Sequence, residues 1–204
     1  METLLVILWT VFGFFFGSIP FSLLLGRLAL STDVRGFGDG NPGAMNAWRA
    51  GGFRIGLAAG VLDFLKGAVP VGLAHYFFGI EGWGMVFVAM APVLGSAFSP
   101  FLHFKGGKSI AVTFGVWTGL LMFEGPLVLG ILFGFFSLIQ TEDSWSTILG
   151  MSGFLVYLLL READPQLIVV WAGNMSVLIW KHKTELRKGM ELRPFLQRTL
   201  RRAH

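Results

Sequence analysis

Long apolar runs, separated by short polar or glycine-rich stretches, occupy most of the chain. Seven runs can be drawn, at about 4–28, 53–78, 83–101, 109–122, 126–139, 145–160 and 165–180. A helix that crosses a bilayer needs about 20 predominantly apolar residues. The fourth to sixth runs are short for that length, but each is too apolar for a solvated surface. The pattern therefore predicts an all-α fold, a polytopic transmembrane helix bundle of about seven spans.

Composition supports the same interpretation. Of 204 residues, 54% are hydrophobic and 14% are charged, against about 25% charged in an average soluble domain. The chain has no cysteine, and its four histidines form no HExxH pair, which excludes a disulfide framework and disfavours a zinc site. We expect one domain over residues 1–204, with no metal and no cofactor.

The basic residues predict an orientation. If the N-terminus lies outside, every Lys and Arg falls at or near the inner face except Arg161 and Lys66, which lies within a span. This agrees with the positive-inside rule and places the basic tail, residues 181–204, in the cytoplasm. A net charge of +4 then fits an anionic lipid face or an anionic substrate better than nucleic acid.

The glycine-rich stretch from Gly36 to Gly52 is the first candidate site. Its glycines allow positive φ and close approach to a ligand, and successive exposed N–H groups can bind an anion. Asn41 and Asn46 add amides, and Arg49 adds a forked cation suited to phosphate. A flexible linker between two helices is the alternative interpretation.

A second candidate lies between Phe101 and Gly115. Gly107-Lys108-Ser109 is similar to the end of a P-loop, but Leu102 stands where that motif needs glycine, which disfavours a nucleoside triphosphatase. The remaining prediction is a Gly-Gly turn at a helix N-terminus, where Lys105 and Lys108 help to bind an anion. An ordinary basic inner loop is the alternative.

Polar residues also occur in the tail and inside the apolar runs. His182 and Glu185 share one face if the tail is helical; otherwise this is a basic, membrane-hugging end. Asp63 and Lys66, three residues apart, predict a buried ion pair that is either purely structural or braces the site. Four further residues are expected to form hydrogen bonds between helices: Ser18, Ser22, Asn174 and Ser176.

Five segments together carry a family resemblance. They are GSIPFSLLLGR (17–27), GNPGAMN (40–46), VLDFLKG (61–67), FKGGKSIAV (104–112) and KHK (181–183). With these segments the chain resembles the bacterial acyl-phosphate-dependent glycerol-3-phosphate acyltransferases, the PlsY family. The resemblance implies a seven-helix bundle in the bacterial cytoplasmic (inner) membrane. It also implies an enzyme that moves a fatty acyl group from acyl phosphate to the 1-hydroxyl of glycerol 3-phosphate, giving lysophosphatidate.

The resemblance also implies a set of site residues on the cytoplasmic side. Catalytic roles fall to Lys108 and His182, with Asp39 and Glu185 as candidate bases beside a substrate phosphate oxygen. Binding roles fall to Gly38, Gly40, Asn41, Gly43, Asn46, Arg49, Lys105, Gly106 and Gly107. The expected partners are the two substrates and membrane lipid.

Three positions depart from the family pattern: Asp39 replaces a serine, Ser96 a histidine and Glu185 an asparagine. Carboxylates repel anionic substrates unless cations neutralise them, and we expect Arg35, Arg49 or Lys183 to do so. The departures leave two alternatives open. One is a paralogue with another acyl donor or acceptor; the other is a non-enzymatic protein or transporter that binds a phosphorylated solute. The HxxxxD motif of other glycerolipid acyltransferases is absent, which disfavours acyl-CoA as donor.

Overall fold

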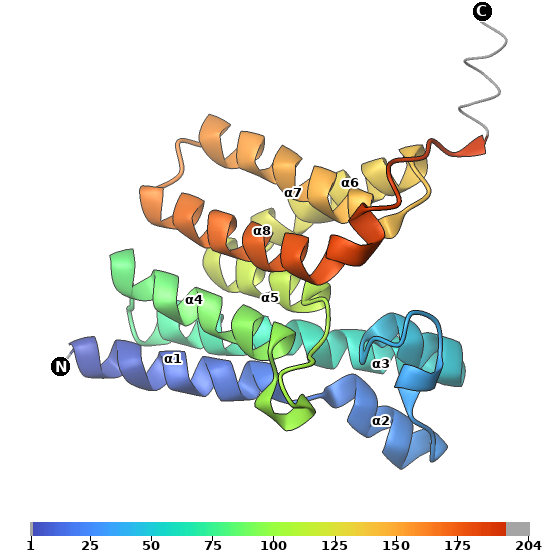
Figure 1. Cartoon of the computed structure of the whole chain (residues 1–204). Coiled ribbons are helices and arrows are strands. Elements are labelled where there is room, and N and C mark those ends of the chain that lie inside the picture. The colour runs from blue at the N-terminus through green and yellow to red at the C-terminus, as the bar shows by residue number, and fades with distance from the viewer. Residues whose placement is uncertain (1, 195–204) are drawn as a thin grey trace, which may run out of the picture. The chain divides into compact units, whose positions relative to one another are not determined.

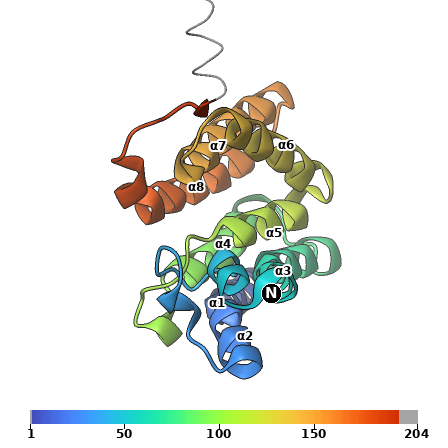
Figure 2. The ribbon, with the colours of Figure 1, turned by 90° about the vertical axis from the view of Figure 1, so that its right-hand side faces the viewer.

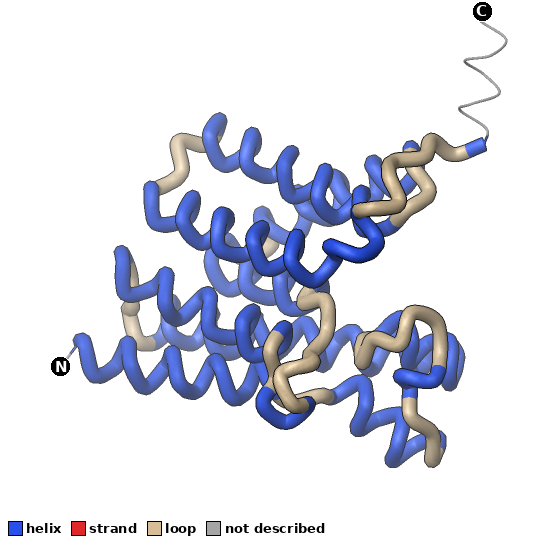
Figure 3. The backbone as a smooth tube through the Cα atoms, in the orientation of Figure 1, coloured by secondary structure: helices blue, strands red, loops and turns tan. Residues whose placement is uncertain are grey.

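Helices make up the protein and no strand occurs in residues 2–194, the part of the chain that the computed structural model describes (Figures 1 and 3). The α-helices are α1 (Glu2–Ser18), α2 (Phe21–Leu30), α3 (Ala44–Gly72), α4 (Gly82–Ala97), α5 (Ile110–Leu121), α6 (Glu124–Ile139), α7 (Asp143–Leu160) and α8 (Pro165–Leu186). Three short helical segments join them: η1 (Val34–Gly36), η2 (Leu73–Phe77) and η3 (Pro100–Leu102). The all-α prediction is confirmed.

Several of these helices have the length and composition of membrane spans. Four apolar stretches meet both requirements, Glu2–Leu30, Ala44–Phe77, Gly82–Leu102 and Asp143–Leu160, and Ile110–Leu121 and Glu124–Ile139 are shorter. The protein is therefore a multi-pass membrane protein. The count of seven spans and the outward N-terminus remain predictions.

The described residues form two compact units, 2–126 and 127–194 (Figures 1 and 2). In the first unit α1 packs on α4, and both α2 and α5 pack on α3. Glycine permits the close contacts. A Cβ at Gly17 would collide with the backbone of Pro92, and one at Gly115 would collide with the Phe64 carbonyl. Small residues at helix contacts are typical of membrane bundles.

The first apolar run is not one helix, as the sequence predicted, but two. The chain breaks at Ile19 and Pro20 between α1 and α2, because proline lacks an N–H and disfavours helical backbone in the residue before it. The carbonyl groups exposed by the break find donors: the Ser99 hydroxyl bonds to the Ser18 carbonyl at 2.6 Å, and Lys66 Nζ bonds to the Ile19 carbonyl at 2.8 Å.

Helix α3 folds back on itself at Gly52, where φ is 75° and ψ is −172°. Gly56 lies against Trp48, and a Cβ at Gly60 would lie 3.6 Å from that of Ala44. A straight helix would separate residues 44 and 60 by about 24 Å at 1.5 Å per residue. The prediction of one loop from Gly36 to Gly52 is therefore wrong in its second half, which is the short arm of a helical hairpin.

In the second unit α7 packs on α8, and its glycines contact α6, with Gly150 against Phe133 and Gly153 against Leu132. Helix α8 continues to Leu186, so the KHK segment is helical rather than a turn after a helix that ends near Trp180. Residues 195–204 of the basic tail, which include Arg198, Arg201 and Arg202, lie outside the described residues.

The expected hydrogen bonds between helices are partly confirmed. The Ser22 hydroxyl donates to Asp63 Oδ2 at 2.8 Å, from α2 to α3. Ser18 and Ser176 instead bond to carbonyls of their own helices, Phe14 and Ala172, a common use of serine in apolar helices. Asn174 is fully buried in α8.

Candidate functional site

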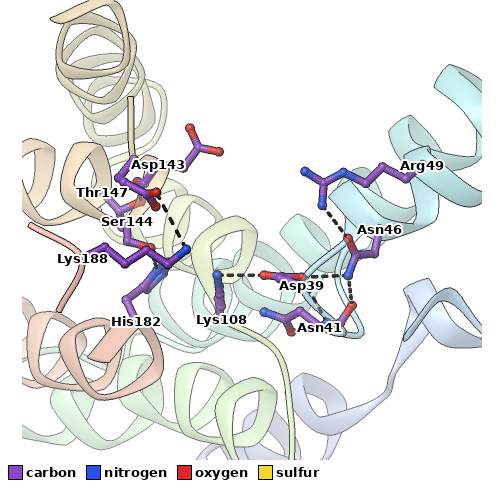
Figure 4. A network of polar contacts seen from close by, with 11 residues as sticks. Asp39, Asn41, Asn46, Arg49, Lys108, Asp143, Ser144, Thr147, His182 and Lys188 are labelled. Atoms are coloured by element: carbon purple, nitrogen blue, oxygen red, sulfur yellow. Dashed lines mark hydrogen bonds and ion pairs between the residues drawn. The ribbon is translucent and has the colours of Figure 1, made fainter. Parts of the chain in front are cut away.

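Asp39 lies at the centre of a polar network in the first unit (Figure 4). Its Oδ2 lies 2.9 Å from Lys108 Nζ. Its Oδ1 accepts hydrogen bonds from Asn46 Nδ2 at 2.8 Å and from the Asn41 backbone N–H at 3.2 Å. The glycine-rich loop and the segment before α5 therefore meet on one side of this unit, as the sequence predicted.

Asn46 links the loop to Arg49. Its Nδ2 also donates to the Asn41 carbonyl at 2.9 Å, and its Oδ1 accepts from an Arg49 terminal nitrogen at 3.1 Å. Asn46 is buried, with 2% of its surface exposed. Its position on the first turns of α3, next to the loop, lets one amide align the loop backbone and the guanidinium together.

Lys108, rather than Arg35 or Arg49, neutralises Asp39. Arg35 instead pairs with Asp33 at 2.6 Å, and that pairing lowers the pKa of Asp33. Burial raises the pKa of Asp39, but the hydrogen bonds from Lys108, Asn41 and Asn46 outweigh burial and bring it to about 2. Asp39 is therefore a carboxylate at every physiological pH.

The segment before α5 is held by close backbone contacts. The Gly107 N–H donates to the Ser96 carbonyl at 3.0 Å, and a Cβ at Gly106 would collide with the same carbonyl. Ser96, at one of the three departures from the family pattern, thus contributes its backbone. Lys108 and Ser109 then lead into α5, whose N-terminal end attracts anions.

A cavity of about 300 Å³ lies beside this network, within the first unit. Residues 42–45 at the start of α3 and residues 107–112 at the start of α5 line it, together with residues of the α1–α2 break and the end of α4. Two helix N-terminal ends therefore face one cavity, and Lys108 is among its lining residues. This arrangement suits a small anion or a phosphorylated head group.

Asp63 and Lys66 form the predicted ion pair at 2.9 Å and also line the cavity. Both are buried, with 8% and 4% of their surfaces exposed. The pair bonds to Ser22 and to the Ile19 carbonyl, so it fixes the α1–α2 break against α3. The second alternative from the sequence, a pair that braces the site, agrees with this placement.

In the second unit His182 is buried in α8, and its Nδ1 lies 2.8 Å from the Ser144 hydroxyl of α7 (Figure 4). If the hydroxyl donates, the other ring nitrogen, Nε2, carries the proton. Glu185 follows one turn later on the same helix, as predicted for a helical tail. Nearby, Lys188 lies 3.8 Å from Glu142.

The structure thus brings together most of the predicted binding residues of the first unit. Lys105 and Gly43 do not join the polar network, although Gly43 lines the cavity.

Ser144 was not singled out from the sequence, because a serine at the start of an apolar run carries no local signal. Among residues 2–194, no group of three or more His, Asp or Glu side chains is placed to hold a metal ion.

Gly38 offers a direct test of the loop. Its φ of 58° is left-handed, and a Cβ there would collide with Arg49 and Asn46. For the acyl transfer that the sequence resemblance implies, we expect Gly38→Ala to displace both side chains and to lower the rate of product formation by about tenfold to a hundredfold, as small misplacements do. Gly36→Ala is the matched control, because no atom lies within 4 Å of its Cβ position. Equal rates for the two variants would contradict the prediction.

Comparison with known proteins links this geometry to one family. The family model described as glycerol-3-phosphate acyltransferase matches residues 7–191. Glycerol-3-phosphate acyltransferase 1 of Thermotoga maritima is 36% identical over 192 residues, covering 87% of this chain and 94% of its own. The glycerol-3-phosphate acyltransferase of Maridesulfovibrio salexigens is 34% identical over 203 residues, covering 92% of this chain and 96% of its own.

Solved structures agree. Crystal structures of PlsY (YgiH), an integral membrane glycerol 3-phosphate acyltransferase, are similar in both the glycerol 3-phosphate form and the lysophosphatidic acid form. The TM-scores are 0.81 and 0.80, each at 27% identity. The first alignment covers 94% of this chain and 97% of the other, and the second covers 90% of each.

Proposed function

Because the chain belongs to the glycerol-3-phosphate acyltransferase family, we propose that it transfers a fatty acyl group from acyl phosphate to the 1-hydroxyl of glycerol 3-phosphate. The products are lysophosphatidate and inorganic phosphate, and the proposed location is the bacterial cytoplasmic membrane. The observation that carries the assignment is the meeting of Lys108, the glycine-rich loop and two helix N-terminal ends at one cavity. These groups are cationic or donate hydrogen bonds, as two phosphorylated substrates require.

The chemistry needs positioning more than a covalent nucleophile. The hydroxyl oxygen attacks the acyl carbonyl carbon, the bond from that carbon to the phosphate oxygen breaks, and phosphate leaves with the electron pair. In this proposal Lys108 and the N–H groups at the start of α5 bind the donor phosphate and the developing oxyanion. Preorganised charge of this kind is usually the largest catalytic contribution.

Arg49 is proposed to bind the acceptor phosphate. The Asn46 amide holds the guanidinium at one end, which leaves the other nitrogens of the fork to bind phosphate oxygens. The contact between Ser144 and His182 supports a single imidazole orientation. In the second unit, an Nε2–H of His182 would then be available as a hydrogen-bond donor, in keeping with the catalytic role that the family resemblance implies for this residue.

The attacking hydroxyl must also lose a proton. With a pKa of about 2, Asp39 is a weak base at neutral pH, which disfavours the role of general base that the sequence left open for it. A phosphate oxygen of a substrate, whose second pKa is near 6, is better matched to the task. Glu185 remains a candidate.

The proposed function is tested with purified protein, radiolabelled glycerol 3-phosphate and two alternative donors. We expect labelled lysophosphatidate with acyl phosphate and none with acyl-CoA, together with release of one inorganic phosphate for each product formed. Product from acyl-CoA alone would overturn the proposed donor. No product from either donor would overturn the proposed reaction and favour another acceptor or a non-enzymatic role.

A further inference from the structure

The anion-binding groups of the glycine-rich loop already hold an anion, and it belongs to the protein. The Asn41 N–H and the Asn46 amide both donate to one oxygen of Asp39, while Lys108 pairs with the other oxygen. These are the donors that the loop would offer to a phosphate. Figure 4 shows the Asp39 carboxylate between Lys108 and Asn46.

The backbone of the loop places the carboxylate there. Gly38 and Gly40, on either side of Asp39, have φ values of 58° and 76°, and two left-handed residues fold the loop so that the side chain turns back toward the Asn41 N–H. Asp39 nevertheless stays within reach of solvent, with 38% of its side chain exposed. A group in this position can move away without opening the protein core.

We propose that Asp39 is a built-in competitor for phosphate: it occupies the Lys108 site when no substrate is bound, and every phosphate that binds there must displace it. This inference deepens the proposed function and rests on it for the identity of the ligands. Asp39 would thereby tune the specificity of the site. A ligand with contacts beyond its phosphate, such as an acyl chain, displaces the carboxylate more readily than free phosphate does.

The consequence concerns the product. Inorganic phosphate leaves the acyl donor at the Lys108 site, and a strongly cationic site would retain it. A carboxylate that returns to Lys108 favours release, because two anions cannot share one ammonium group without repulsion. Asp39 would therefore weaken inhibition by inorganic phosphate.

A purely structural role for Asp39 predicts the opposite change in phosphate affinity when the carboxylate is removed. If the carboxylate only holds Lys108 in place, its removal should disorder the lysine and weaken phosphate binding. If it competes, its removal should strengthen phosphate binding. Because hydrogen bonds that involve a charged group are stronger than neutral ones, the expected change in Kd is about tenfold or more.

The test is calorimetric titration of the purified full-length protein with inorganic phosphate, at fixed pH and ionic strength. We expect Asp39→Asn and Asp39→Ser each to lower the Kd for phosphate by about tenfold relative to wild type. Asp33→Asn is the matched control, because Asp33 is a nearby carboxylate that pairs with Arg35 and not with Lys108, and its Kd should equal that of wild type. Thermal unfolding of each variant checks that it is folded.

An equal or higher Kd in both Asp39 variants would overturn the proposal. The proposal is also overturned if Asp33→Asn strengthens phosphate binding as much as Asp39→Asn does, because equal effects would reflect the change in net charge alone. Binding of phosphate is measured without turnover, so this outcome is independent of the acyl-transfer assay. An active wild type with unchanged phosphate binding in the variants would refute the competitor and leave the proposed function standing.

Discussion

Replacing Lys108 with alanine should reduce acyl transfer by about a hundredfold to a thousandfold, the usual loss when one preorganised charge is removed from an active site. Lys108 combines three features: an ion pair with Asp39 at 2.9 Å, a place in the wall of the cavity, and a position just before α5. In the proposed reaction its ammonium stabilises charge that develops as phosphate leaves. The measurement is the rate of lysophosphatidate formation from acyl phosphate at saturating glycerol 3-phosphate.

Two further variants test whether the loss of activity is specific to the ammonium group of Lys108. Lys108→Arg keeps the charge but changes its shape, so it should retain part of the activity, since guanidinium and ammonium are not interchangeable. Arg54→Ala removes an exposed cation beyond the bend of α3, and its activity should stay close to that of wild type. A folded Lys108→Ala variant with full activity would exclude Lys108 from catalysis.

The helical class could be predicted from the sequence because lipid imposes a simple rule: every backbone polar group must be satisfied within its own helix. Long apolar runs then identify helices directly. The two interruptions that shape the site were harder to predict. Pro20 was visible but lies within an unbroken apolar run, and Gly52 ends a stretch of sequence that is glycine-rich throughout.

The sequence predicted most residues of the site but not the ion pair between Asp39 and Lys108. Asn41, Asn46, Arg49 and Lys108 were selected because glycines, amides and cations together indicate an anion site, and Asp39 was selected because it departs from the family pattern. No local pattern pairs Asp39 with Lys108, 69 positions away, and Arg35, Arg49 or Lys183 were expected to neutralise the carboxylates instead. Local spacing predicts contacts within a helix, such as that of Asp63 with Lys66, and long-range contacts depend on how helices pack.

Breaking the buried ion pair should destabilise the protein more than any other single change proposed for it. Removing one partner of a buried pair leaves an uncompensated charge and costs about 3–5 kcal/mol. Lys66 also donates to the Ile19 carbonyl, and Asp63 accepts from Ser22, so the α1–α2 break loses an anchor as well. We expect both Asp63→Ala and Lys66→Met to lower the midpoint of thermal unfolding in detergent.

A double-mutant cycle separates the energy of the interaction between Asp63 and Lys66 from the effect of each residue alone. In the Asp63→Ala, Lys66→Met double variant no buried charge remains, and methionine fills part of the volume of the lysine side chain. Its free energy of unfolding should therefore exceed that of Asp63→Ala alone, because an ion pair replaced by apolar side chains costs less than a lone buried charge. The effects of the two single substitutions would simply add if the residues acted independently. An additive result would mean that Asp63 and Lys66 each stabilise the bundle through their other bonds, and that their mutual interaction adds nothing to the free energy of unfolding.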